Sequence, residues 1–192
     1  MIIFWDTEYT SWENSDDLMQ TGAGQDYEIF QIAAVKLDPK NAWKEVDSLN
    51  VLIKPTKNPK LSDYVQKLTG ITQKDIEREG LSPQEGIKQF ADFSEGLMSY
   101  SFGNDAFPLS STCRINNIPL PRSKQNFHDV RLYFERAGLQ VTGYSSGTIH
   151  KALNIQMSGH VHNALHDCRS IAETTKKLVE LGKLKYQDGE LS

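Results

Sequence analysis

The chain has 192 residues, 38% of them hydrophobic, and a net charge of −4, which fits one α/β domain with a sizeable core. The negative balance argues against a protein that coats duplex nucleic acid through general positive charge, although carboxylates gathered around divalent cations would lower the charge without excluding a narrow nuclease cleft. The first apolar run is too short for a signal peptide, and no apolar segment is long enough to span a membrane. The two cysteines, Cys113 and Cys168, lack the spacing of metal ligands. We therefore expect a cytoplasmic protein.

Three strands are predicted in the first third of the chain. Residues 2–6 form a short run that is apolar on both faces, as in a central strand. Residues 9–26 are polar and acidic, which indicates a long surface loop, and its role is left open. Strands at residues 28–38 and 43–55 follow, separated by the turn sequence DPKN. Three strands in quick succession predict an antiparallel meander.

Helices dominate the rest of the prediction. Residues 82–97 begin with Ser-Pro and show apolar residues at helical spacing, and residues 98–103 form a fourth strand. Helical spacing also marks residues 125–138, which include Phe127, and a short helix is expected at residues 145–155. The last helix covers residues 162–184, with one apolar stripe.

We therefore predict a single mixed α/β domain at residues 1–185 and a flexible tail at residues 186–192. The central sheet is mixed, begins with the antiparallel meander, and carries helices on both faces. The sequence shows no repeats, low-complexity tracts or linkers.

Two carboxylates stand at the end of the first predicted strand. Because residues i and i+2 of a strand point to the same face, Asp6 and Glu8 project side by side. Two like charges this close repel unless a cation joins them. An isolated Asp-x-Glu pair is more often a pair of solvated turn residues, so the pair alone does not establish a metal site.

Three further polar residues follow in the chain. Asp105 lies just after the fourth predicted strand, in a Gly-Asn-Asp context that is also ordinary turn chemistry. Asp167 lies at the edge of the apolar stripe of the last helix, where an unpaired acid is costly. His162 precedes it by five residues, which places it on the loop that enters this helix.

The motifs DTEYT, SFGND and HNALHD resemble, in this order, the three exonuclease motifs of the DEDDh 3′–5′ exonucleases. That superfamily includes ribonuclease T, the proofreading subunit of bacterial DNA polymerase III, and the KapD-like and histone-mRNA-trimming exonucleases, and the last two are the branch towards which the sequence leans. The segments EIFQIAAV and LTGIT also resemble the family, and the likeness covers nearly the whole chain. It implies a ribonuclease H-like fold.

The resemblance implies a role for each polar residue. Asp6, Glu8, Asp105 and Asp167 would bind two divalent metal ions, Mg²⁺ or Mn²⁺, because such hard ions prefer carboxylate oxygens. His162 would act as the general base, and it alone among the histidines has the family's spacing to Asp167. Three other histidines could compete for the role of general base but do not match this spacing: His128, His160 and His166.

Substrate contacts follow from the same resemblance. The residues that would touch the terminal nucleotides are Thr7, Tyr9, Leu68, Thr69, Ile71 and Phe102. For Leu68 and Ile71 the alternative that they belong to the core is equally open. The partner would be the 3′ end of a nucleic acid, single-stranded or frayed, and the chain could act as a homodimer or within a larger nucleic-acid-processing complex.

The resulting hypothesis is a metal-dependent 3′–5′ exonuclease that releases nucleoside 5′-monophosphates from DNA or RNA by a two-metal mechanism with a histidine base. The alternative is a catalytically silent nucleic-acid-binding or interaction module on the same fold. Completeness of the five-residue set favours the enzyme. The sequence does not choose between DNA and RNA, between single and double strands, or between repair, RNA trimming and defence.

Overall fold

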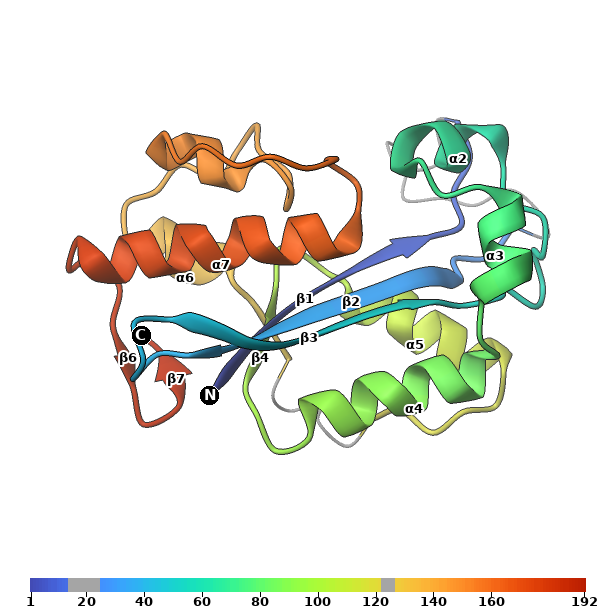
Figure 1. The fold of residues 1–192 in the computed structure, drawn as a ribbon, viewed down its shortest axis with the longest axis horizontal. Coiled ribbons are helices and arrows are strands. Elements are labelled where there is room, and N and C mark those ends of the chain that lie inside the picture. Colours follow the sequence, from blue (N-terminus) through green and yellow to red (C-terminus); the bar gives the residue numbers. More distant parts are fainter. Residues whose placement is uncertain (14–24, 122–126) are drawn as a thin grey trace.

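A five-stranded mixed sheet forms the centre of the computed structural model, which describes residues 1–13, 25–121 and 127–192 (Figure 1). The strand order is β3-β2-β1-β4-β5, with β1, β2 and β3 antiparallel and β4 and β5 parallel to β1. The predicted meander is therefore confirmed. The strands are β1 (Ile2–Tyr9), β2 (Ile29–Asp38), β3 (Lys44–Leu52), β4 (Ser99–Ser101) and β5 (Phe127–Asp129).

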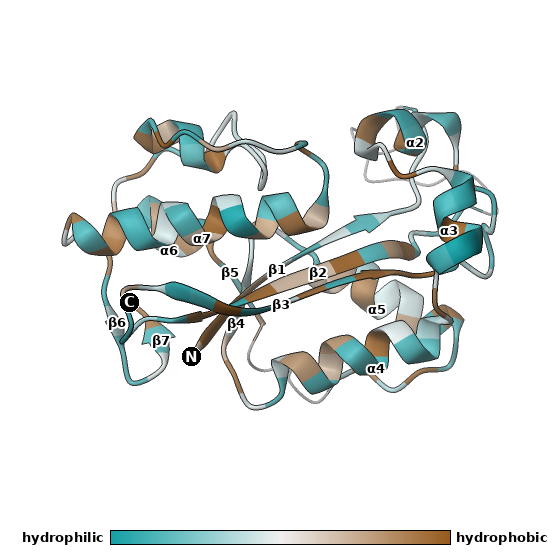
Figure 2. Cartoon of the chain, viewed as in Figure 1, coloured by the Kyte–Doolittle hydropathy of each residue, from teal (hydrophilic) through white to brown (hydrophobic). Residues whose placement is uncertain are grey.

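Strand β1 lies in the middle of the sheet because its side chains are apolar on both faces. The residues from Ile2 to Trp5 are fully buried, as a central strand requires. The strand continues beyond the predicted end at Asp6 and pairs with β2 as far as Tyr9. Figure 2 shows β1 hydrophobic at its start and hydrophilic at its tip, so the polar residues gather at its carboxyl end.

Helices cover both faces of the sheet, as predicted. Helix α7 (Ala164–Glu180) packs on one face, where Phe4 and Ile171 share a core. Helices α4 (Pro83–Ser94) and α5 (Ala106–Ile115) pack on the other face against Trp5 (Figure 1). Within the described ranges, no helix combines the length and the apolar character needed to cross a membrane.

Four shorter helices lie among the described residues between 63 and 153. The two helices of the segment before α4 are capped by Ser62 and Thr72, whose side chains accept hydrogen bonds from backbone N–H groups, although residues 67–80 carry no element in the sequence prediction. The elements are α2 (Asp63–Thr69), α3 (Gln73–Glu79), α6 (Arg131–Arg136) and the 3₁₀ helix η2 (Ile149–Leu153).

The helix predicted at residues 125–138 begins later than expected. Phe127 lies in β5, and α6 starts only at Arg131. The cause is Asp129, whose carboxylate accepts hydrogen bonds from the backbone N–H groups of Gly103 and Arg131. The apolar spacing that suggested one helix therefore spans a strand, a turn and a helix. Residues 122–126 lie outside the described part of the chain.

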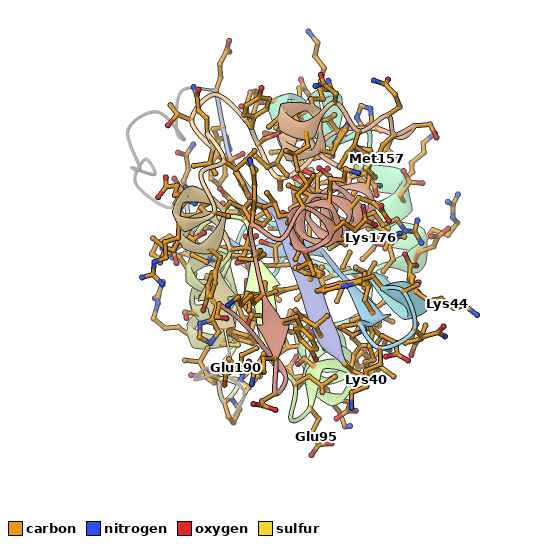
Figure 3. All side chains as sticks on the ribbon, turned by 90° about the vertical axis from the view of Figure 1, so that its left-hand side faces the viewer. Lys40, Lys44, Glu95, Met157, Lys176 and Glu190 are labelled. Atoms are coloured by element: carbon orange, nitrogen blue, oxygen red, sulfur yellow. The ribbon has the colours of Figure 1, made fainter. Side chains whose placement is uncertain are left out.

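The carboxyl-terminal residues form a hairpin within the segment for which a flexible tail is predicted, residues 186–192. Strands β6 (Tyr186–Gln187) and β7 (Glu190–Leu191) pair antiparallel, and this end of the molecule faces the viewer in Figure 3, where Glu190 is labelled. Leu191 is buried, and its backbone N–H donates to the hydroxyl of Tyr100 at 3.0 Å. A single buried leucine thus anchors a segment whose polar composition suggested fraying.

The acidic loop predicted at residues 9–26 lies mostly outside the described residues. At its two ends, the backbone N–H of Thr10 donates to the carbonyl of Glu28, and the Thr10 hydroxyl donates to the carbonyl of Asp26. These bonds bring the two ends of the segment together beside the tip of β1.

Candidate active site

A cavity of about 480 Å³ opens at the carboxyl ends of β1 and β4. All five residues predicted to act in catalysis line it. They come from three separate parts of the chain: β1, the start of α5, and the segment that leads through the turn before α7 into its first turn. They are Asp6, Glu8, Asp105, His162 and Asp167.

Asp6 and Glu8 project from the end of β1 onto the same face of the sheet. Their exposed fractions are 5% and 9%. Opposite Glu8 on β2 stands Gln31, whose side-chain oxygen accepts a hydrogen bond from the backbone N–H of Ala164 at 3.1 Å. Gln31 therefore fixes the start of α7 to the strand beside the two carboxylates.

Asp105 is held by the residue that lies between the two β1 carboxylates. Its Oδ1 accepts hydrogen bonds from the backbone N–H of Thr7 at 3.0 Å and from the Thr7 hydroxyl at 2.7 Å. Although Asp105 stands at the start of α5, its side chain makes no helix-capping bond. Thr7, predicted as a nucleotide contact, thus orients a carboxylate.

Asp167 lies in the first turn of α7 and is 1% exposed. Ser146 donates a hydrogen bond to its Oδ2 at 2.9 Å. Its Oδ1 is buried and has no hydrogen-bond partner among the described residues. The backbone of Gly147 lies so close that any Cβ there would collide with this carboxylate. The sequence prediction missed Ser146 and Gly147, because SSG looked only like the start of a helix.

Burial and mutual repulsion disfavour the charged forms of these acids. Burial raises the pKa of Asp105 to about 6 and that of Asp167 to about 7. The pKa of Asp6 is raised well above its ordinary value, first by burial and then by the charges of Asp105, Asp167 and Glu8. Such a cluster is costly unless cations offset its charge.

His162 lies on the loop that enters α7, as predicted. Its backbone has φ +67°, a left-handed conformation that a residue with a Cβ adopts at a cost. The side chains of Glu8, His162 and Asp167 each offer one ligand atom, and these atoms lie within 4.8 Å of one another. His162 is therefore placed either to take a proton beside the carboxylates or to join them as a ligand.

The three competing histidines do not line this cavity. His128 lies in β5 and hydrogen-bonds the hydroxyl of Tyr133. His166 is buried, with its ring edge-on to that of His150. His160 contacts the backbone oxygen of Leu68 at 3.1 Å.

The predicted substrate contacts divide into two groups. Tyr9, Leu68 and Phe102 line the cavity together with Thr7, whereas Thr69 and Ile71 do not line it. The Thr69 hydroxyl donates to the carbonyl of Val65 within α2, and Ile71 belongs to a small core with Phe30 and Leu61. The structure therefore places Thr69 and Ile71 in the packing of α2 and α3.

Three aromatic residues that the sequence prediction missed, Tyr27, Tyr64 and Phe107, line the cavity together with Tyr9. The ring of Tyr27 lies 5.3 Å from that of Tyr9 and 5.7 Å from that of Phe107, both edge-on. Phe107 is 51% exposed although it lines the cavity. Phe107 went unnoticed because no helix was predicted after Asp105.

The raised pKa values predict how stability depends on pH. Above pH 3.8 the carboxyl groups of Asp105 and Asp167 lose their protons in the unfolded chain but keep them longer in the folded protein. The free energy of unfolding therefore falls as the pH rises from about 3.8 to about 7. We expect calorimetry in a chelator to show the unfolding temperature falling across this range. Mn²⁺ should raise that temperature more at about pH 8 than at about pH 5, since cations bind deprotonated carboxylates. An unfolding temperature that Mn²⁺ does not change at either pH would contradict a cation site in this cavity.

The family model RNase_T, described as an exonuclease, matches residues 3–175. Among curated proteins, the search found no relative that matches this chain.

Solved structures share the fold. The nuclease domain of 3′hExo, a DEDDh family member bound to rAMP, has a TM-score of 0.81 and 20% identity over 98% of this chain and 96% of that chain. Cell-death related nuclease 4 has a TM-score of 0.74 and 20% identity, over 94% and 64%. E. coli exonuclease I in complex with a dT13 oligonucleotide has a TM-score of 0.65 and 17% identity, over 92% and 40%. These likenesses confirm the predicted fold class.

Proposed function

This chain belongs to the exonuclease family, as its motifs suggested, and from that premise we propose that it hydrolyses nucleic acids from the 3′ end in a metal-dependent reaction. The observation that carries the proposal is the gathering of four carboxylates and one histidine in a single cavity. The products would be nucleoside 5′-monophosphates and a chain shortened by one nucleotide.

The carboxylates fit divalent cations. Asp167 Oδ1 is buried and has no partner among the described residues, and the clustered acids have raised pKa values, as expected of ligands whose counter-charge must come from outside the chain. We propose that Asp6, Glu8, Asp105 and Asp167 would hold two Mg²⁺ or Mn²⁺ ions. Such ions supply positive charge to both the attacking and the leaving oxygens of a phosphodiester displacement.

The chain's own residues would organise the reaction around this charge. His162 accepts a proton from the attacking water, a task that proteins give most often to a histidine side chain. The water oxygen bonds to phosphorus as the bond to the O3′ of the preceding nucleotide breaks. That oxygen takes a proton from solvent water and leaves as a hydroxyl, and His162 returns its proton to solvent. Thr7 keeps Asp105 oriented, and Ser146 does the same for Asp167.

The cavity walls suit unpaired bases. Leu68 and Phe102 stand beside the carboxylates, and the rings of Tyr9, Tyr27 and Phe107 continue the wall. Bases stack on aromatic side chains without regard to sequence. Among the structural neighbours, one is bound to rAMP and another to a dT13 oligonucleotide. We propose that the substrate is the single-stranded or frayed 3′ end of either DNA or RNA.

A digestion panel tests this function. Single- and double-stranded DNA and RNA of the same sequence are each incubated with Mg²⁺, with Mn²⁺ and with a chelator. We expect single strands to be digested faster than blunt duplexes, and the chelator to stop digestion. Digestion that continues in the chelator, or no digestion of any substrate with either metal, would contradict the proposal.

A further inference from the structure

One hydrogen bond joins the two sides of the cavity mouth. On one side, α2 contributes the side chain of Leu68 to the cavity wall. On the other, the segment before α7 carries His162. The Nε2 of His160 lies 3.1 Å from the backbone oxygen of Leu68. We call this hydrogen bond the latch.

The latch is made within the turn that positions His162. The backbone N–H of Asn163 donates to the carbonyl of His160 at 3.2 Å, which closes a turn over residues 160–163. Inside this turn His162 has φ +67°. A residue with a Cβ keeps this conformation only where its surroundings hold it.

The two ends of the turn are held differently. At the α7 end, Asn163 caps the helix and the N–H of Ala164 is bound to Gln31 of the sheet. At the other end, the latch ties the turn to α2. Gly70 ends α2 with φ +75° and lies beside the latch: a Cβ at this position would touch His160 Nε2 at 3.6 Å, an ordinary van der Waals distance.

We propose that His160 is a positioning residue, whose latch holds His162 at the reacting water and couples it to the wall that meets the terminal nucleotide. This role rests on the proposed exonuclease function. A proton acceptor must stand within hydrogen-bond reach of the water, and displacing a catalytic group by 1 Å can lower the rate about a hundredfold. Loss of the latch therefore lowers kcat more than it raises KM.

The latch does not depend on the charge of His160. A carbonyl oxygen only accepts hydrogen bonds, so Nε2 must carry a proton. Both the neutral ring with its proton on Nε2 and the charged ring meet this requirement. A glutamine amide, which reaches about as far as Nε2, can replace it, whereas the shorter asparagine cannot.

Steady-state kinetics on a single-stranded oligonucleotide with Mn²⁺ tests the latch. For His160→Ala and His160→Asn we expect kcat to fall about tenfold, with KM within about twofold of wild type. His160→Gln should restore kcat and keep the wild-type pH profile. Leu68→Ala, which keeps the accepting backbone oxygen but trims the wall, should raise KM instead. Ser158→Ala, an exposed change in the same segment, is the matched control.

Amide hydrogen exchange over residues 157–163, measured without substrate, separates failure of the latch from failure of the proposed function. Exchange should be faster in His160→Ala and His160→Asn, and unchanged in His160→Gln. Wild-type kcat and exchange in His160→Ala would overturn the latch. Loss of activity in His160→Gln with an altered pH profile would also overturn it, because His160 would then act directly on the substrate.

Discussion

Replacing Asp167 by asparagine should lower metal-dependent digestion by at least about a thousandfold. The substitution keeps the shape of the side chain and an oxygen that can accept the hydrogen bond from Ser146. It removes the charge of a buried carboxylate whose Oδ1 has no partner among the described residues. The rate of release of mononucleotides from a single-stranded oligonucleotide with Mn²⁺ measures the effect.

Stability distinguishes loss of the metal site from loss of the fold. Because Asp167 repels Asp6, the asparagine variant should unfold in a chelator at or above the wild-type temperature, and Mn²⁺ should raise that temperature less. Asp92→Asn, an exposed change on α4, is the matched control and should digest at the wild-type rate. Wild-type digestion by the Asp167→Asn variant would exclude Asp167 from the chemistry.

Replacing His162 by alanine should slow digestion by about a hundredfold to ten-thousandfold, the range typical of losing a general base. Mn²⁺ affinity, measured by titration calorimetry without substrate, should stay within about threefold of wild type. This outcome separates two roles that the geometry allows, because a ligand atom of His162 lies within 4.8 Å of those of Glu8 and Asp167.

A fall of tenfold or more in Mn²⁺ affinity would show instead that His162 is a metal ligand. The matched control is His128→Gln, which changes a histidine that hydrogen-bonds Tyr133 outside the cavity. This variant should keep both the digestion rate and the Mn²⁺ affinity. A similar loss of rate in both histidine variants would indicate a general loss of structure.

The fold was predictable where a pattern repeated along one element. The continuous apolar runs of β1 and β2 and the apolar stripes of α4 and α7 follow local rules. The prediction failed where a long-range contact decided the outcome. Asp129 delays the start of α6 by accepting hydrogen bonds from Gly103 and Arg131, and burial of Leu191 orders the terminal hairpin.

The candidate site shows the same division. The five residues that we propose as catalytic could be found from their type, order and spacing, because each of them stands in a recognisable motif: Asp6, Glu8, Asp105, His162 and Asp167. The residues that support them could not. Gln31, Ser146 and Gly147 act through contacts with distant parts of the chain, and no local sequence pattern marks such contacts.

We expect this chain to remove nucleotides one at a time from the 3′ end, and end-labelled single strands test this most directly. With Mn²⁺, a 5′-labelled oligonucleotide should give a ladder that descends one nucleotide at a time. The same strand labelled on its 3′-terminal nucleotide should release the label as a mononucleotide from the first turnover. A ladder from the 3′-labelled strand with immediate release of the 5′ label, or internal cleavage of both, would contradict the claim.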